Sequence, residues 1–266
     1  MKELQGQVAI VTGAGRGFGK AIAKRLAAEG AAVAVTSRTK SQLDEVCAEI
    51  QAEGGRALPV AADVTNREDV VRVVNEARTR LGDISLLISN AGVPGPFGPI
   101  WEVDPEIWWK SQAVHIRAPM LFLREVLPSM VGRGTGRVII VSAIASRLVA
   151  PYLSAYCVGK IAQTRIIEEL AAETKGQGVS AFAIDPGFVF TGIADETMNS
   201  PDAQRWLPQM VARLRARKNE PGSDADLARC AQRCVDLASG RYDALSGKYM
   251  ELTDDLDGMV RAASRR

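Results

Sequence analysis

Short apolar runs rich in β-branched residues alternate along the chain with stretches in which apolar residues recur every three or four positions. The runs predict strands and the stretches predict amphipathic helices. The expected strands cover residues 8–11, 32–36, 57–61, 84–89, 138–142, 179–184 and 248–252. They are apolar on both faces and separated by helices, a pattern typical of a parallel sheet with helices on both sides.

The expected helices cover residues 18–29, 43–50, 105–130, 152–174 and 224–238, and one more begins after residue 65. For that helix, Thr65-x-x-Glu68 has the pattern of a capping box. Pro119 is expected to disturb the 105–130 helix, since proline cannot donate a helical hydrogen bond, and Pro128 lies near its end.

No linker, repeat or low-complexity segment divides the sequence. We therefore expect one doubly wound Rossmann domain over residues 1–266, with a mostly parallel, seven-stranded sheet and helices on both faces. The least regular stretch is residues 186–223, which we take as a candidate lid over a substrate.

Composition excludes several kinds of protein. The chain has 266 residues, a net charge of +2, one histidine and four scattered cysteines. A zinc site with two histidines is impossible, and we expect no metal site. Unpatterned thiols, no signal peptide and no apolar run long enough to span a bilayer predict a cytoplasmic protein without a membrane partner. The near-neutral charge gives no reason to expect nucleic acid.

A glycine-rich turn stands between the first predicted strand and the first predicted helix. It reads Thr12-Gly13-Ala14-Gly15-Arg16-Gly17-Phe18-Gly19. Glycines allow the backbone to approach a pyrophosphate, and the helix start supplies free N–H groups. The strand–turn–helix context predicts a dinucleotide site.

The end of the second strand indicates which dinucleotide binds. An NAD site usually has an acidic residue there for the ribose 2′-hydroxyl. This chain has Thr36-Ser37-Arg38-Thr39-Lys40 instead. Arg38 and Arg16 suit a 2′-phosphate, because guanidinium groups match phosphate geometry. NADP is therefore favoured over NAD.

Five segments stand in the order and spacing of known motifs: Thr12–Gly19, Asp63-Val64, Ser89-Asn90-Ala91-Gly92, Tyr156-Cys-Val-Gly-Lys160 and Asp185-Pro186-Gly187-Phe-Val189-Phe-Thr191. Through them the chain resembles the short-chain dehydrogenase/reductase family over nearly its whole length. The cofactor-binding residues that this resemblance implies, with those of the turn and second strand, are Gly13, Arg16, Gly17, Phe18, Gly19, Ser37, Arg38, Asp63, Val64, Asn90, Ala91, Gly92, Tyr156, Lys160, Pro186, Gly187, Val189 and Thr191.

The spacing of Tyr156 and Lys160 supports proton transfer. Residues four apart on a helix share a face. A tyrosine with an ordinary pKa near 10 is a poor base at neutral pH, and a lysine cation nearby favours its phenolate. Tyr156 then exchanges a proton with an alcohol or a carbonyl. The resemblance implies that Lys160 also holds the nicotinamide ribose.

The serine position departs from the family. The resemblance places a catalytic serine thirteen residues before the tyrosine, where this chain has Ala143. Ser142 is one residue early and points to the opposite side of an extended backbone. Ser146 lies three residues late, on the expected substrate loop. The two are equal candidates for the missing hydroxyl.

The asparagine position departs as well. Val114-His115-Ile116-Arg117-Ala118 is similar to the family's V-N-x-x-G, whose asparagine helps a water chain to reach the lysine. The His115 imidazole is suited to relaying a proton. Its main-chain carbonyl is a second candidate for the same work, and a purely structural buried histidine is the third interpretation.

The function that these features predict is an NADP-dependent oxidoreductase, which interconverts an alcohol and a carbonyl on a small or medium organic molecule. The alternative is a homologue that binds the cofactor but has a lost or different, non-redox activity. The resemblance also implies a homodimer or homotetramer.

Overall fold

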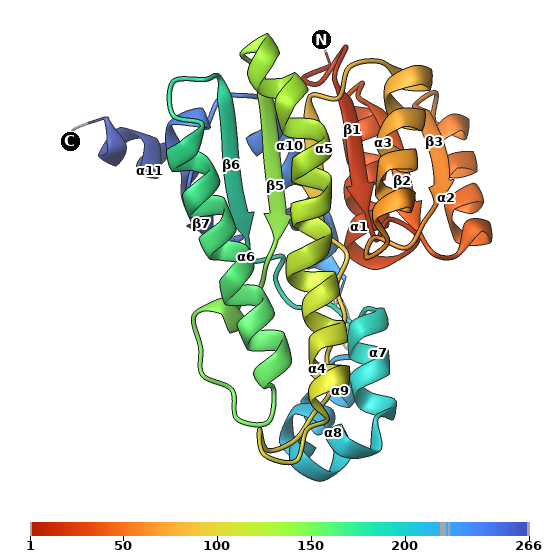
Figure 1. Ribbon diagram of the computed structural model, residues 1–266, viewed down its shortest axis with the longest axis vertical. Helices are drawn as coiled ribbons and strands as arrows, with labels where there is room; N and C mark the ends of the chain where they lie inside the picture. Colours follow the sequence, from red (N-terminus) through yellow and green to blue (C-terminus); the bar gives the residue numbers. More distant parts are fainter. Residues whose placement is uncertain (1, 219–221, 223, 265–266) are drawn as a thin grey trace.

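The computed structural model describes residues 2–218, 222 and 224–264, and Figure 1 shows their arrangement. In this part of the chain, seven strands form one sheet in the order β3-β2-β1-β4-β5-β6-β7. Every strand pair is parallel. The strands are β1 (Val8–Thr12), β2 (Ala32–Ser37), β3 (Arg56–Ala61), β4 (Leu86–Ser89), β5 (Gly136–Val141), β6 (Val179–Ile184) and β7 (Tyr249–Met250). The predicted fold class is confirmed.

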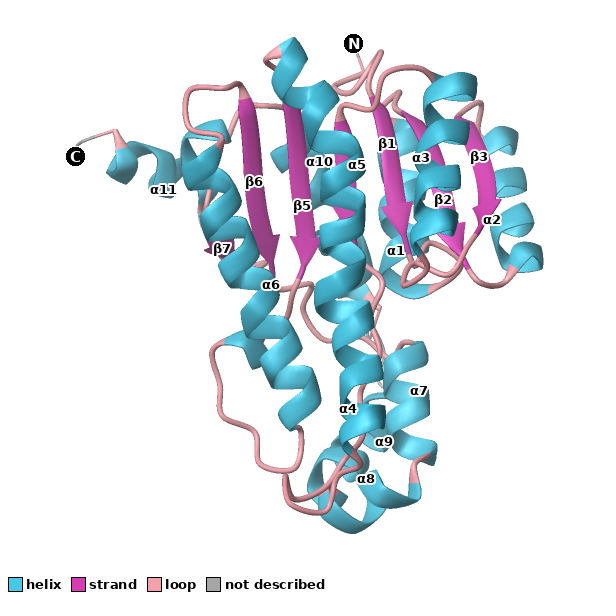
Figure 2. Ribbon diagram, in the orientation of Figure 1, coloured by secondary structure: helices cyan, strands magenta, loops and turns pink. Residues whose placement is uncertain are grey.

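Helices cover both faces of the sheet (Figure 2). One apolar core lies under α1 (Gly17–Ala28), α2 (Lys40–Ala52) and α10 (Ala225–Ala238). A second core lies under α3 (Arg67–Leu81), α5 (Ala118–Arg133) and α6 (Ser154–Glu173). The strands are buried between these layers, as their apolar sequences predict.

The strand order reverses between β1 and β4. In open α/β sheets, ligands bind at the carboxyl ends of the strands beside such a reversal. The glycine-rich turn follows β1 at this edge, and the short helix α4 (Pro105–Gln112) lies beyond the same edge (Figure 1).

The predicted 105–130 helix is interrupted as expected. Between α4 and α5, residues Ala113–Arg117 form a π-helical turn. Pro119 lies in the first turn of α5 and has no N–H to donate to the carbonyl of residue 115, four positions earlier. The helical path therefore continues through this site with an altered hydrogen-bond pattern.

The prediction of a Thr65–Glu68 capping box is wrong. Asn66 is the N-cap of α3, and its side chain accepts a hydrogen bond from the Asp69 main-chain N–H at 2.9 Å. Thr65 instead donates its hydroxyl proton to Asp63. Asparagine and threonine compete for this role, and the helix begins one residue later than the motif suggested.

Residues 186–218 are more regular than predicted. They contain α7 (Gly192–Asn199), α8 (Pro201–Trp206) and α9 (Pro208–Lys218). Two small apolar clusters hold these helices, one around Phe97, Ala203 and Val211 and the other around Ala194, Met198 and Leu214. Residues 219–221 and 223 of the candidate lid lie outside the described part of the chain.

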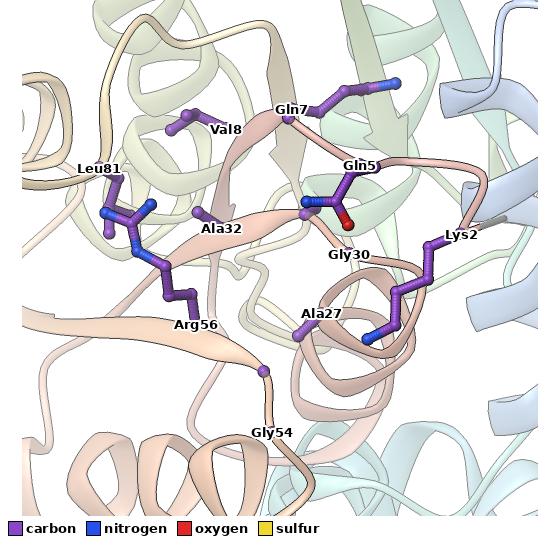
Figure 3. A pocket seen from close by; sticks show the side chains of 13 residues that line it. Lys2, Gln5, Gln7, Val8, Ala27, Gly30, Ala32, Gly54, Arg56 and Leu81 are labelled. Atoms are coloured by element: carbon purple, nitrogen blue, oxygen red, sulfur yellow. The ribbon is translucent and has the colours of Figure 1, made fainter.

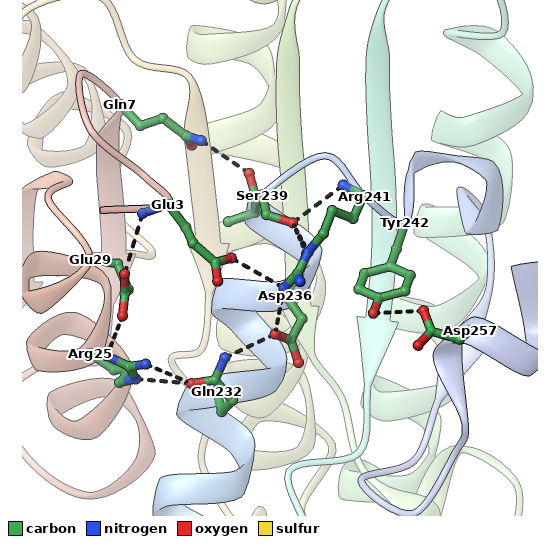
Figure 4. A network of polar contacts seen from close by, with 11 residues as sticks. Glu3, Gln7, Arg25, Glu29, Gln232, Asp236, Ser239, Arg241, Tyr242 and Asp257 are labelled. Atoms are coloured by element: carbon green, nitrogen blue, oxygen red, sulfur yellow. Dashed lines mark hydrogen bonds and ion pairs between the residues drawn. The ribbon is translucent and has the colours of Figure 1, made fainter. Parts of the chain in front are cut away.

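Polar contacts join the two ends of the chain near the amino ends of the strands (Figure 4). Arg25 on α1 contacts Gln232 on α10, and Arg241 contacts both Glu3 and Asp236. A polar hollow of about 210 Å³ lies at this same edge of the sheet (Figure 3). The hollow therefore lies at the amino ends of the strands, whereas the glycine-rich turn lies at their carboxyl ends.

The chain ends in α11 (Leu256–Ala263), which projects from the edge of the sheet (Figure 1). Across the described ranges, no helix is both long and apolar enough to cross a membrane.

Candidate active site

The glycine-rich turn has the geometry of a pyrophosphate site. Gly13 has φ of +64°, a conformation that favours glycine. A Cβ on Gly19 would stand 2.3 Å from the Gly13 carbonyl oxygen, so α1 begins in direct contact with the turn. The N-cap residue, Arg16, makes no side-chain capping bond, which leaves the first N–H groups of α1 available to an anion.

Thr12 fastens the turn to the end of β4. Its hydroxyl accepts hydrogen bonds from the main-chain N–H groups of Asn90 at 2.9 Å and Ala91 at 3.0 Å. The Asn90 amide donates in return to the Thr12 carbonyl at 2.9 Å. This threonine was not among the predicted site residues, although it immediately precedes the glycines.

The end of β2 also fits a dinucleotide. The Ser37 hydroxyl is buried and has no hydrogen-bond partner among the described residues, and it lies 3.0 Å from where a Gly15 Cβ would stand. Arg38 follows it and is exposed, without a described acidic partner. A buried donor and an unpaired cation beside the glycine turn are groups that an adenosine ribose and its phosphate would satisfy.

Arg16 makes a different contact from the one expected. Its guanidinium lies 2.9 Å from the Glu196 carboxylate on α7 and packs against Gly192, where a Cβ would come within 2.2 Å of it. Both partners of this ion pair are about half exposed, so the pair contributes little to stability. Arg16 is therefore free to exchange Glu196 for a phosphate at small cost.

Other predicted cofactor residues lie near the carboxyl ends of β1, β3 and β4. Phe18 packs against the core under α1, and Val64 is buried in the core under α3. Asp63 accepts hydrogen bonds from the Thr65 N–H and hydroxyl, which shape the loop after β3. Gly92 faces His115, whose ring lies 3.5 Å from the position of a Gly92 Cβ.

The segment after β6 returns to the glycine turn. Gly187 has φ of +79° and packs on Asp226, which accepts a hydrogen bond from the Phe188 N–H at 2.9 Å. Pro186 and Val189 are buried. The Thr191 methyl lies 3.2 Å from where a Gly17 Cβ would stand. Asp226, absent from the sequence prediction, fixes the start of this segment.

Tyr156 and Lys160 share the inner face of α6, as predicted. The Lys160 ammonium lies 5.5 Å from the centre of the Tyr156 ring. Burial lowers the pKa of Lys160 to about 7, against a smaller opposing effect of Asp185. Burial raises the pKa of Tyr156 above its ordinary value, and the Asp185 charge adds to the rise. Without a further positive charge, this tyrosine stays protonated at neutral pH.

The negative charge of Asp185 raises the pKa of both Tyr156 and Lys160. The sequence analysis did not predict Asp185 as a site residue. It lies at the end of β6 and accepts a hydrogen bond from the Ile144 N–H at 3.3 Å. Partial burial raises its pKa above the usual range of aspartate.

His115 is fully buried in the π-helical turn. Its Nε2 lies 2.9 Å from the Val93 carbonyl, which fixes the proton on that nitrogen. Burial, with help from the Lys160 charge, lowers the pKa of His115 to about 3. The ring meets Tyr156 edge-on, with centroids 5.6 Å apart. The imidazole is therefore neutral at physiological pH.

Gly159 allows this close approach of α6 to the π-helical turn. A Cβ at this position would stand 2.7 Å from both the Cβ and the Cγ of His115. Real Cβ atoms do not come so close, so any larger residue at 159 would displace the histidine.

Gln163 completes the buried end of the site. It lies three residues after Lys160 and accepts a hydrogen bond from the ammonium at 3.2 Å. Its Nε2 donates to the His115 carbonyl at 3.0 Å. This residue was missed; the signal in the sequence was a polar residue on the apolar face of α6, within reach of the lysine.

Neither candidate serine contacts Tyr156 through a hydrogen bond in the described structure. The Ser142 hydroxyl donates to the Lys160 main-chain carbonyl at 3.1 Å. Ser146 is buried next to Tyr249 on β7. Ala143 is nearly buried and has no hydroxyl. The choice between the two serines stays open.

An apolar hollow of about 600 Å³ opens beside α6. Its walls include Ser146, Leu148, Tyr152, Cys157 and Ile161. Tyr152 has φ of +68°, an unusual conformation for a bulky residue, and its ring stacks 5.2 Å from that of Trp206 on α8.

Comparison with known proteins shows the family of this chain. The model of the short chain dehydrogenase family matches residues 7–202. The chain belongs to the short-chain dehydrogenase/reductase family. Its relative MYCFIDRAFT_6125, a short chain dehydrogenase of Pseudocercospora fijiensis, is 35% identical over 99% of this chain and 85% of its own length.

Solved structures agree with the fold of this short-chain dehydrogenase/reductase. A gluconate 5-dehydrogenase from Burkholderia cenocepacia in complex with NADP and tartrate is 25% identical, with a TM-score of 0.78 over 93% of this chain and 94% of its own. An NAD⁺-bound xylitol dehydrogenase, 24% identical, has the same fold with a TM-score of 0.81 over 94% and 98%. The chain is thus an oxidoreductase of an NAD(P)-using family that acts on small molecules.

Proposed function

We propose that this enzyme uses NADP in preference to NAD and interconverts an alcohol and a carbonyl on a small or medium organic substrate. The observation that carries the proposal is the pairing of Tyr156 with the buried Lys160 on one face of α6. The pair lies at the carboxyl edge of the sheet, where the glycine turn offers its N–H groups.

Tyr156 acts as the proton donor and acceptor. When bound, the nicotinamide supplies a hydride to the carbonyl carbon or accepts one from the alcohol. During reduction, the Tyr156 hydroxyl gives its proton to the carbonyl oxygen, and the phenolate that remains recovers a proton from solvent. The Lys160 ammonium stabilises that phenolate, and the reverse steps oxidise an alcohol.

The preference for NADP is supported by the groups at the end of β2. Ser37 and Arg38 stand where an acidic residue would select the ribose 2′-hydroxyl, and the acidic partner of nearby Arg16 in the described structure is the exposed Glu196. Phosphate recognition by these two arginines is the expected consequence. The NADP in the Burkholderia cenocepacia gluconate 5-dehydrogenase is consistent with this proposal.

Two measurements test the function together. Tryptophan fluorescence, titrated with NADPH and with NADH, is expected to show tighter binding of NADPH. A panel of carbonyl and alcohol substrates is then screened with the wild type and with Tyr156→Phe. Removing the phenol hydroxyl is expected to lower kcat by about 10²–10⁴-fold, the range for a general acid, while NADPH binding stays unchanged. Turnover retained in Tyr156→Phe contradicts the proposed mechanism.

A second candidate function is supported by the serine position. Ala143 lacks the hydroxyl, and Ser142 is engaged with the Lys160 carbonyl. Losing one donor to a developing oxyanion costs about 10²–10³ in rate. A homologue that binds NADPH but has no redox activity would show tight binding and no turnover across the whole panel.

Further proposals concern the lid and the assembly. We propose that residues 186–223 cover the substrate, and that the enzyme is a cytoplasmic homodimer or homotetramer. Exposed apolar side chains on α4, α5 and α6 support assembly, among them Ile107, Trp109, Met120, Val158 and Ile161. Light scattering of the purified protein gives its subunit number directly.

A further inference from the structure

The buried end of the active site contains an amide that links two functional groups. On α6, Gln163 accepts a hydrogen bond from the Lys160 ammonium at 3.2 Å and donates one to the His115 carbonyl at 3.0 Å. Gln163 is about 1% exposed, Lys160 3% and His115 0%. A polar side chain so deeply buried is costly unless its hydrogen bonds are made.

The His115 carbonyl lacks its α-helical donor because of the local backbone. It lies in the π-helical turn, and Pro119, four residues later, has no N–H to form the α-helical bond. The Gln163 amide supplies a hydrogen bond across the gap between α6 and this turn. The same side chain thus couples the irregular turn to the lysine.

The Lys160 ammonium has three N–H donors. One is directed to the Val141 carbonyl at 2.9 Å and a second to Gln163. These two acceptors, one from the end of β5 and one from α6, leave a single donor for a ligand or for Tyr156. The direction of that donor is fixed because the other two are taken.

We propose that Gln163 is a positioning residue of this enzyme: its amide bridges Lys160 to the His115 carbonyl, favours the charged form of the lysine and aims the remaining N–H of the lysine into the cofactor site. The inference rests on the proposed function for its catalytic meaning. Its structural part, the link between Gln163 and the charge state of Lys160, does not depend on that function.

An amide has a further consequence at this position. It neither gains nor loses a proton near neutral pH, so the bridge transmits orientation and passes no proton. Asp185 at the end of β6 opposes the effect of burial on the Lys160 pKa, and the Lys160 charge in turn lowers the pKa of His115 on the π-helical turn. Neither is hydrogen-bonded to the ammonium in the described structure, which leaves Gln163 as its side-chain acceptor.

The test follows the Lys160 side chain directly, in full-length protein labelled with ¹³C and ¹⁵N at lysine. The Lys160 signal is assigned by its loss in Lys160→Met and titrated between pH 5 and 11. Gln163→Met removes both hydrogen bonds at similar volume, and Gln163→Glu keeps an acceptor and adds a negative charge. Gln112→Met is the matched control, because Gln112 is also buried and joins α4 to the Ala155 carbonyl of α6 at 2.9 Å, with no hydrogen bond to Lys160 in the described structure.

The proposal predicts opposite shifts in the two Gln163 variants. The pKa of Lys160 is expected to fall by about one unit in Gln163→Met, since a hydrogen bond to the charged form is lost. It is expected to rise by about one unit or more in Gln163→Glu, and to stay unchanged in Gln112→Met. Unchanged values in both Gln163 variants, or an equal fall in Gln112→Met, overturn the proposal.

Binding of NADPH then separates this inference from the proposed function. If the wild type binds NADPH, the Kd of Gln163→Met is expected to be roughly tenfold weaker, and Gln112→Met should match the wild type. An unchanged Kd in Gln163→Met removes the catalytic part of the inference. If no protein binds NADPH while the Lys160 shifts appear, the proposed function fails and the link between Gln163 and Lys160 stands.

Discussion

The two ends of the candidate active site, the glycine turn and the surroundings of Lys160, differ in how their polar groups are satisfied. At the glycine turn, Arg16 is held by an exposed ion pair and Ser37 has no described hydrogen-bond partner. At the other end, Lys160 is buried with two acceptors already in place. One end has an exposed cation and a buried hydroxyl without a described partner, and the other has a buried cation with two acceptors.

This difference follows from burial. A charged group removed from water must be satisfied inside the protein, so the lysine end is rigid by necessity. An exposed arginine loses little when it changes partners. Substitutions at the lysine end are therefore expected to alter folding and catalysis together, whereas those at the glycine turn are expected to change only cofactor affinity.

The largest stability effect is expected from His115 in acid. Its pKa of about 3 in the fold lies below the ordinary 6.5, so the unfolded chain binds a proton that the folded protein rejects. This contribution is complete above pH 6.5 and is lost as the pH falls toward 3. Between pH 6.5 and 4.5 the free energy of unfolding should fall by about 2 kcal/mol more in the wild type than in His115→Asn. Urea denaturation at both pH values measures this difference. An equal change in the free energy of unfolding in the two proteins would contradict the prediction.

Gly159→Ala should have the next largest effect. The added methyl overlaps His115, and overpacking of this kind costs about 1–3 kcal/mol. Gly132→Ala is the matched control, because Gly132 lies in α5 with nothing within 4 Å of its Cβ position. That change should stabilise the protein by about 0.5–1 kcal/mol. Thermal and urea denaturation compare the two, and a stable Gly159→Ala protein would show that the contact is looser than described.

A smaller effect, confined to the cofactor, is expected for Arg38→Ala. Losing a guanidinium that pairs with a 2′-phosphate should weaken NADPH binding about tenfold. NADH has no 2′-phosphate, so its Kd should not change, and unfolding should be unaffected because Arg38 is exposed. Fluorescence titration with both cofactors checks this. Equal weakening of both would assign Arg38 another role.

The smallest effect is expected for Glu196→Gln. It frees Arg16 from an exposed ion pair, which should change the free energy of unfolding by less than about 1 kcal/mol. NADPH binding should become slightly tighter, since the phosphate no longer competes with a carboxylate. Titration with NADPH at low and high salt checks that the effect is electrostatic, because screening by salt should abolish the gain in affinity.

Local patterns predicted much of this molecule. The glycine turn, the Tyr156–Lys160 spacing and the alternation of strands and helices are readable because their signals lie within a few residues of one another. The disturbance near Pro119 was also expected, since the missing N–H is a property of the residue itself.

Other features depend on contacts between distant segments. Gln163 meets His115 across 48 positions, and Arg16 meets Glu196 across 180. No periodicity within either segment encodes such a pairing. The helices of residues 186–218 were missed because they bury small clusters against each other and against Phe97, which weak local patterns do not reveal. The N-cap of α3 was misplaced because Thr65 and Asn66 are both good caps.

The contact between Gly159 and His115 also limits how this site can change over generations. A Cβ at 159 would stand 2.7 Å from the His115 Cβ itself, an atom that every residue except glycine carries. Shortening the side chain at 115 therefore leaves position 159 closed. A larger residue at 159 requires a shift of the main chain of α6 or of the π-helical turn, so the glycine is expected to outlast replacement of the histidine.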